Sequence, residues 1–553
     1  MASASGVASP YQENANAFAA RGGVEKKEED VSKDHEFGDL EGDFDAGSSY
    51  DTTKRKLKPR HIQLMGIGGT IGTALFVQIG RALMKGGPAS LFLAFTFWCT
   101  VILAVNNAIS EMVTFMPITS PFVRFAARFV DESFGVAAGW NFFIFEAALV
   151  PFEIVACTQI LDFWGASETV PTGAIIAICI FLYAAINSTV VKYYGESEFW
   201  LALGKMLLII GLLCFTFITM VGGNPKHDAY GFRYWKNPGA FAEHYETGGL
   251  GKFMGLVACL IQASFTIAGP DYVAISAGEA EDPRRVMPAA FKAVTYRLAA
   301  FFVLGSLAIG VVVPYNDPEM VAAFGEGKPG AAASPYVLAM TRLGISGLPH
   351  LVNALVLTAA FSAGNSYVYC SSRCLYGLAL DGHAPKFFTR CTKHGIPIYA
   401  VLVSLGFGLL SFLQLSNSAS VVLSWFISLV TASQLINFSV MSISYLCFRR
   451  ALAAQGIARD SLPHTTYWQP YTTYFALLCT GTMCIVGGYE VFLPGNWNVP
   501  TFLFSYTMIA VFPAISIGWK IVKRTEMPAP EDIDLFTEER AIIDAYEKKL
   551  CAF

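Results

Sequence analysis

The chain is poor in charge. Only 14% of its 553 residues are Asp, Glu, Lys or Arg, whereas 54% are hydrophobic; an average soluble protein has about 25% charged residues. A soluble fold cannot bury so large a share of apolar side chains. The formal net charge is −4, and no dense basic patch with interleaved aromatic residues is present. Nucleic acid is therefore excluded as a partner.

Catalytic and metal-binding motifs are also missing. The sequence contains no serine elbow, no HExxH and no Walker loop. Its 12 cysteines lie mostly within apolar runs, without CxxC or Cys/His spacing, and are predicted to be small buried hydrophobic residues rather than disulfides or ligands. We expect no enzyme, no cofactor and no metal site. An integral-membrane enzyme, the rival class, would need a catalytic cluster that the sequence does not offer.

Long apolar runs fill most of the chain. They have the length of about 18–25 residues that a helix needs to cross a hydrocarbon core about 30 Å thick, and they lack the alternation of a β-barrel. We predict an all-α polytopic membrane protein in the lipid bilayer, with twelve transmembrane helices. The spans are 62-83, 88-115, 137-163, 172-191, 197-221, 252-277, 295-313, 349-376, 397-415, 419-447, 471-492 and 500-522.

Three regions and an orientation follow from the charges. Residues 1-57 are predicted to be a disordered cytoplasmic tail without a signal peptide. Residues 58-522 form the twelve-helix core, and residues 523-553 form a second cytoplasmic tail. Lys and Arg concentrate on one set of connections, for example Arg284-Arg285 and Arg449-Arg450. The positive-inside rule therefore places both termini in the cytoplasm.

Two spans carry helix breakers at corresponding positions. The first reads MGIGGTIGTALF and the sixth reads ASFTIAGPDYVAIS. Breaks five helices apart indicate an inverted five-plus-five helix repeat, in which broken helices 1 and 6 form a binding site at the midplane. The alternative is that the glycines of the first span only allow close helix packing. Packing alone does not require Pro270 after Gly269.

Broken helices 1 and 6 suit a zwitterion. Free N–H groups at the start of a half-helix favour a carboxylate, while free carbonyl groups at the other break favour an ammonium group. An α-amino acid is therefore the predicted substrate class. The candidate carboxylate site is the backbone of Gly69, Thr70, Ile71, Gly72 and Thr73, and the candidate amine and side-chain site is formed by Phe265, Thr266, Ile267 and Ala268.

Ionisable residues deep in the spans need an explanation because each costs roughly 2.5–3.5 kcal/mol to insert. Lys205 in the fifth span is predicted to be a titratable coupling group, or else to snorkel to the interface. Glu153 in the third span lines the pocket or serves as a structural carboxylate. Glu146 lies seven residues earlier on the same face. Glu111 is predicted to have a structural or gating role, and Asp271 to cap a helix start after Pro270.

The motifs resemble those of the fungal amino-acid permeases, the yeast amino acid transporter family of the amino acid-polyamine-organocation superfamily. The resemblance covers nearly the whole chain and rests on LKPRHIQLMGIGGTIGTALFV, SEMVTFMPI, GWNFFIFEAALVPFE, GFRYWKNPGAF, AGEAEDPRR and SAGNSYVYCSSRCLYGLALDGHAPKFF. YGESEFW and the Gly-Pro-acid run of the sixth span are most similar to proline and general amino-acid permeases. A departure is Ala74, where the family usually has Gly.

The resemblance implies a secondary active transporter. It implies proton-coupled uptake of amino acids, neutral or proline-like, across the plasma membrane by alternating access. It also implies that Lys205 takes part in proton coupling, with Ser362 and Asn365 of the eighth span facing it. Lys26, Lys27 and Lys33 resemble tail lysines that the family presents to ubiquitin ligase machinery, with plain solvated charge as the alternative, and Cys551 in KKLCAF is a candidate for lipidation. The alternative function is a non-transporting amino-acid sensor of the same fold, for which longer tails are expected.

Overall fold

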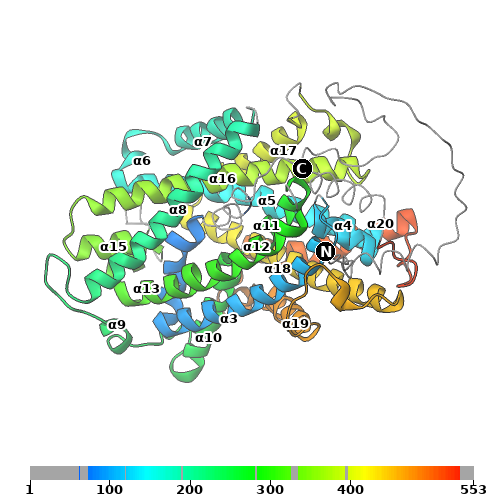
Figure 1. Cartoon of the computed structure of the whole chain (residues 1–553). Helices are drawn as coiled ribbons and strands as arrows, with labels where there is room; N and C mark the ends of the chain where they lie inside the picture. The colour runs from blue at the N-terminus through cyan, green and yellow to red at the C-terminus, as the bar shows by residue number, and fades with distance from the viewer. Residues whose placement is uncertain are drawn as a thin grey trace, which may run out of the picture. The chain divides into compact units, whose positions relative to one another are not determined.

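The computed structural model describes Ile62 and residues 72–118, 120–188, 191–280, 283–324, 334–392 and 396–535. Over these residues the chain is helical and has no β-strand (Figure 1). Ten helices in this part of the chain are long and apolar enough to cross a membrane. The prediction of an all-α polytopic membrane protein is confirmed. Most of the two predicted tails, including Lys26, Lys27, Lys33 and Cys551, lies outside the described residues.

The twelve predicted spans all have counterparts. The helical segment Ala74–Phe115 combines the first two, and it is interrupted at Gly87, whose φ of 78° and ψ of 173° are not helical. A Cβ at this position would lie 2.6 Å from the backbone nitrogen of Ala242. Gly87 therefore permits both the positive φ and the close approach of the two backbones. The fourth span is the shorter apolar helix Thr172–Asn187, which completes the twelve.

The helices follow one another with short connections, as labelled in Figure 1. In chain order they are η1 (Ala74–Gln78, a π-helix), α3 (Ile79–Phe115), α4 (Pro121–Phe129), α5 (Glu132–Leu161), η2 (Asp162–Trp164), α6 (Ala166–Thr169), α7 (Thr172–Asn187), α8 (Val191–Met220), α9 (Arg233–Lys236), α10 (Gly248–Thr266), α11 (Pro270–Ile275), η3 (Ser276–Glu279), α12 (Pro283–Arg297), η4 (Leu298–Val303), α13 (Leu304–Val312), α14 (Pro318–Phe324), α15 (Pro335–Arg342), α16 (Leu348–Leu380), η5 (Lys386–Thr389), α17 (Ile398–Gly408), η6 (Leu409–Leu415), α18 (Ala419–Ala454), η7 (Arg459–Ser461), α19 (Tyr471–Val486), η8 (Tyr489–Phe492) and α20 (Val499–Lys523).

Short polar side chains start several of the long helices. Asp131 caps α5 by accepting a hydrogen bond from the Ser133 N–H at 3.1 Å. Ser418 caps α18, and Asn498 caps α20. Each cap satisfies a backbone donor that the helix itself leaves unpaired. The sequence thus fixes these helix starts locally, while the apolar side chains within the helices determine the packing.

Helices five spans apart pack against each other. The most extensive contacts join α5 with α16, the third and eighth spans, and α10 with α3, which carries the first two spans. The fourth and ninth spans, α7 and α17, are also in contact. This pairing is what an inverted five-plus-five repeat produces around its pseudo-two-fold axis. It places the third and eighth spans at the centre of the bundle.

A buried carboxylate joins the end of α3 to the connection between α18 and α19. Glu111 is fully buried and accepts hydrogen bonds from the Tyr445 hydroxyl, from the Arg459 guanidinium and from both the N–H and the hydroxyl of Thr466, at 2.6 and 2.7 Å. These contacts give Glu111 the structural role predicted for it.

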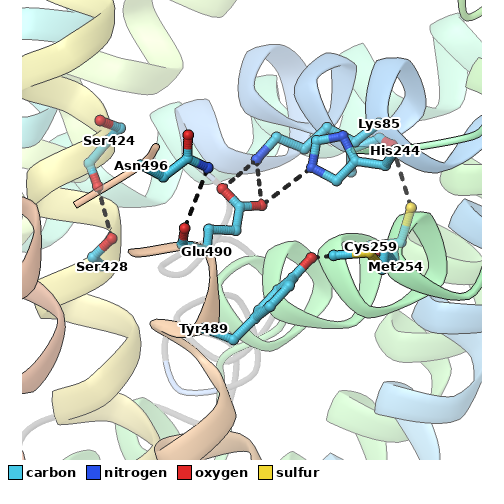
Figure 2. Close-up of polar contacts among 10 residues, drawn as sticks. Lys85, His244, Met254, Cys259, Ser424, Ser428, Tyr489, Glu490 and Asn496 are labelled. Atoms are coloured by element: carbon cyan, nitrogen blue, oxygen red, sulfur yellow. Dashed lines mark hydrogen bonds and ion pairs between the residues drawn. The ribbon is translucent and has the colours of Figure 1, made fainter. Parts of the chain in front are cut away.

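A second carboxylate joins three connections at another point. Figure 2 shows Glu490 of η8 between Lys85, near the end of the first span, and His244, in the segment before α10. The Lys85 Nζ lies 2.7 and 3.0 Å from the two Glu490 oxygens, and the His244 Nε2 lies 3.4 Å from Oε1. Segments far apart in the chain are therefore held together by one side chain.

Glu111→Ala is expected to lower the thermal stability of the protein in detergent. Removing Glu111 leaves the half-buried Arg459 and the Tyr445 and Thr466 donors without their acceptor, which costs about 1–3 kcal/mol. The measurement is the melting temperature from size-exclusion chromatography of heated samples. The exposed Glu319→Ala variant is the matched control. Equal melting temperatures for the two variants would contradict the role assigned to Glu111.

Candidate functional site

The sixth span is broken at the predicted position. α10 ends at Thr266, Ile267–Gly269 is not helical, and α11 starts at Pro270. Gly269 has a φ of 148°, a conformation that side chains rarely adopt. Pro270 then occupies the first position of the new helix, where its missing N–H has no cost. The Gly-Pro pair of the sequence is therefore the local cause of the break.

A buried arginine fills this break, which the sequence analysis did not foresee. Arg297, at the end of α12, is 2% exposed, and its Nη2 donates a hydrogen bond to the Ala268 carbonyl oxygen. A Cβ on Gly269 would lie only 1.7 Å from the same nitrogen. One of the carbonyl groups predicted to bind a substrate ammonium is thus bound by the protein itself. The sequence signal was a lone charge in VTYRLAAFF, at the start of an apolar run.

Asp271 has the capping position predicted for it. Its Oδ1 accepts a hydrogen bond from the Gly269 N–H at 3.2 Å, and its side chain is fully buried. Arg297 interacts with it electrostatically. Its Oδ2 has no hydrogen-bond partner among the described residues. Asp271 is therefore stabilised mainly by the break itself.

The first span contributes through its second half. Gly69, Thr70 and Ile71 lie outside the described residues. The Thr73 N–H donates a hydrogen bond to Glu153 Oε1 at 3.3 Å, and the Thr73 hydroxyl donates to Oε2. A carboxylate of the protein thus binds one of the N–H groups predicted to bind a ligand carboxylate. Glu153 links the third span to the first.

Lys205 lies beside this link and not at an interface. It is 2% exposed, and it interacts electrostatically with Glu153. This burial does not favour the snorkelling alternative, and a role of Lys205 in proton coupling stays a prediction. α8, which carries Lys205, packs against α16, where Ser362 and Asn365 are buried. Asn365 accepts a hydrogen bond from the Asn187 amide at 2.8 Å; that Ser362 and Asn365 face Lys205 stays a prediction.

A cavity lies where these elements meet. Five predicted residues line it: Gly72, Glu153, Phe265, Thr266 and Ala268. Thr73 and Ile267 are buried but do not belong to the lining. The remaining lining residues were not predicted from the sequence. They are Ala74, Phe145, Leu149, Phe152, Tyr272, Tyr367, Val430 and Gln434. They come from the first, third, sixth, eighth and tenth spans, whose contacts a single sequence does not reveal.

The lining combines apolar walls with a few polar groups. Phe145, Phe152 and Phe265 supply aromatic surface, and the Phe152 and Phe265 rings pack edge to face with centroids 5.5 Å apart. Glu153 provides a carboxylate and Gln434 an amide. Such a cavity suits a small molecule with an apolar body and a polar end. Within the described residues, no group of three or more metal-ligating side chains is present.

The sequence matches one family model over nearly its full length. Residues 61–530 match the amino acid permease model. The general amino acid permease AGP2 of Saccharomyces cerevisiae is 49% identical over 90% of this chain and 84% of its own length. A proline-specific permease of Emericella nidulans is 42% identical over 90% of both chains. The proline-specific permease of Saccharomyces cerevisiae is 40% identical over 87% of this chain and 77% of its own.

Among solved structures, the chain resembles a manganese transporter of Eremococcus coleocola. The TM-score is 0.52, and the alignment covers 84% of this chain and 94% of the other. At 12% identity, the likeness concerns the fold alone. It supports the arrangement of spans described above.

Gly269→Ala is expected to destabilise the protein. A residue with a Cβ at positive φ costs roughly 1–3 kcal/mol, and the new methyl group would also displace the Arg297 guanidinium. The measurement is the yield of monodisperse protein and its melting temperature in detergent. Gly406→Ala, where a Cβ meets nothing within 4 Å, is the control. Normal yield and stability of Gly269→Ala would show that the break does not depend on glycine.

Proposed function

Because the chain belongs to the amino acid permease family, we propose that it couples the uptake of amino acids to the proton gradient across the plasma membrane. Membership of this family makes it a multi-pass membrane transporter of amino acids and not an enzyme. Protons as the driving ion, the choice of amino acids, the inward direction of transport and alternating access are the proposed features. It places both termini in the cytoplasm, as the distribution of Lys and Arg favours.

The contact between Glu153 and the broken first helix carries the proposal. Glu153 is buried at the cavity, bound to Thr73 and adjacent to Lys205. The substrate carboxylate and Glu153 would compete for the backbone N–H of Thr73. Binding of the zwitterion would therefore release Glu153 from Thr73, and the freed carboxylate would bind the substrate ammonium group. Substrate binding and the charge near Lys205 would then change together.

Lys205 is the proposed coupling group. A buried lysine shifts readily between its charged and neutral forms, since burial disfavours the charge while a nearby carboxylate favours it. When Glu153 turns to the substrate, Lys205 loses part of this compensation, so that the proton it took up from outside can leave toward the cytoplasm once the site has opened inward. In the outward-facing state, an amino acid and a proton would enter. Broken helices 1 and 6 would then rock against the scaffold and open the site inward.

Neutral or proline-like amino acids are the proposed substrates. The lining places three phenylalanines around the cavity, and Glu153 is the only Asp, Glu, Lys or Arg among the described lining residues. A cationic or acidic substrate side chain would therefore lack an obvious partner of opposite charge once Glu153 binds the α-ammonium group. The proline-specific permeases among the relatives, at 42% and 40% identity, support the same choice.

Uptake of a panel of radiolabelled amino acids into permease-deficient yeast tests the proposal. The wild-type chain is expected to take up one or a few neutral amino acids, faster at acidic than at neutral external pH. Lys205→Met should abolish the acid stimulation because the titratable group is gone. Lys252→Met, at an exposed position, is the control. Absence of any uptake by protein present at the cell surface would contradict transport and would favour a sensor.

Gly72→Ala should lower uptake by at least about tenfold. The new methyl carbon would lie 2.5 Å from Glu153 Oε1 and 3.1 Å from the Ala363 Cβ, so Glu153 must shift, and the methyl group would also crowd the substrate carboxylate that is proposed to accept a hydrogen bond from the Thr73 N–H. A hydrogen bond to a charged group is worth roughly 1.5–3 kcal/mol, and 1.4 kcal/mol is a factor of ten. Initial rates at equal surface expression are the measurement. Gly211→Ala, with nothing within 4 Å, should behave as wild type; unchanged uptake by Gly72→Ala would contradict the site.

A further inference from the structure

A second carboxyl group on α5 lies buried and unused by the mechanism above. Glu146 is 0% exposed, and neither of its carboxyl oxygens meets hydrogen-bond geometry with a described group, although the Tyr272 hydroxyl lies close enough to act on it as a donor. An ionised carboxylate in such a place would be strongly unfavourable. The neutral acid form, which carries a proton, is the form that this environment stabilises.

Glu146 lies close to the cavity. It is seven residues from Glu153 on the same helix, so the two lie on the same face and about 10 Å apart along the axis. Tyr367 lines the cavity and interacts electrostatically with both carboxyl groups, and Tyr272 lines the cavity and interacts with Glu146. Two tyrosines of the cavity lining thus interact with Glu146.

None of the described groups whose electrostatic interaction with Glu146 is resolved is a cation. Those that interact with it are Asp271 and Tyr272 of α11 and Tyr367 and Cys374 of α16. Asp271 has Arg297 and the Gly269 N–H to stabilise its negative charge. Two neighbouring carboxyl groups do not ionise together at low cost. The proton of this pair therefore belongs on Glu146.

We propose that Glu146 is an inner protonation site of the transport cycle. This inference rests on the proposed proton coupling and orientation, in which Glu146 lies on the cytoplasmic side of Glu153. The proton would reach Glu146 through the Tyr367 hydroxyl, which accepts one proton and donates another. When the site opens inward, the acid O–H bond breaks and the proton passes to water. The ionised Glu146 then attracts the ammonium group of the substrate and draws it out of the cavity.

Transport assays separate this role from a structural one. Glu146→Gln mimics the protonated acid, so it is expected to exchange labelled for unlabelled amino acid across preloaded vesicles. It should lose accumulation against a gradient and lose acid stimulation, because no proton can leave. Glu146→Asp should regain acid stimulation. The probe is the amino acid with the highest wild-type uptake in the panel above, and Glu319→Gln is the control. Accumulation by Glu146→Gln with the wild-type pH profile would overturn the proposal.

Infrared spectroscopy detects the proton on Glu146 independently of any transport assay. The purified full chain in lipid nanodiscs is expected to show, at neutral pH, the carbonyl band of a protonated carboxylic acid. The band should disappear in Glu146→Gln and persist in Glu319→Gln. An unchanged band in Glu146→Gln would overturn the inference even if uptake is normal. A wild-type chain that shows the band but takes up no amino acid would instead contradict the proposed function.

Discussion

The hydrogen bonds between Thr73 and Glu153 are the contact on which the site depends. They join the start of a half-helix to a carboxylate on the central helix of the bundle. Gly72 has no room for a side chain because this carboxylate lies against it. Lys205 finds in the same carboxylate an opposite charge. The Glu153 side chain thus affects three things: the position of the first span, the shape of the cavity and the charge of Lys205 in the fifth span.

Charge is scarce in this protein, and two of the described carboxylates lie where separate segments are joined. Glu111 holds the end of α3 to the segment after α18, and Glu490 holds together the end of the first span, the segment before α10 and η8 (Figure 2). Apolar packing between spans has little directional preference in lipid, since lipid tails are as apolar as the side chains. Hydrogen-bonded carboxylates supply the specificity that such packing lacks.

Local features were predictable from the sequence and long-range neighbours were not. Gly269 and Pro270 predicted the break of the sixth span. Glycine tolerates a positive φ and proline lacks a backbone N–H, and both properties belong to the residue itself. Span lengths follow from the thickness of the bilayer. By contrast, the insertion of Arg297 into the break and the contribution of Tyr367 and Gln434 to the cavity depend on which helices pack together. A single sequence shows which side of a helix is apolar, but it does not show which other helix packs against that side.

Arg297 gives the break in the sixth span a cation that is part of the chain. A free ion bound at such a place would enter and leave with each change of shape, and its occupancy would follow the salt of the medium. A guanidinium held by covalent bonds is always present, and its charge does not depend on pH in the physiological range. The loose carbonyl group of Ala268 therefore keeps its donor whatever the composition of the surroundings. The hydrogen bonding at the break therefore does not depend on the ion concentrations on either side of the membrane.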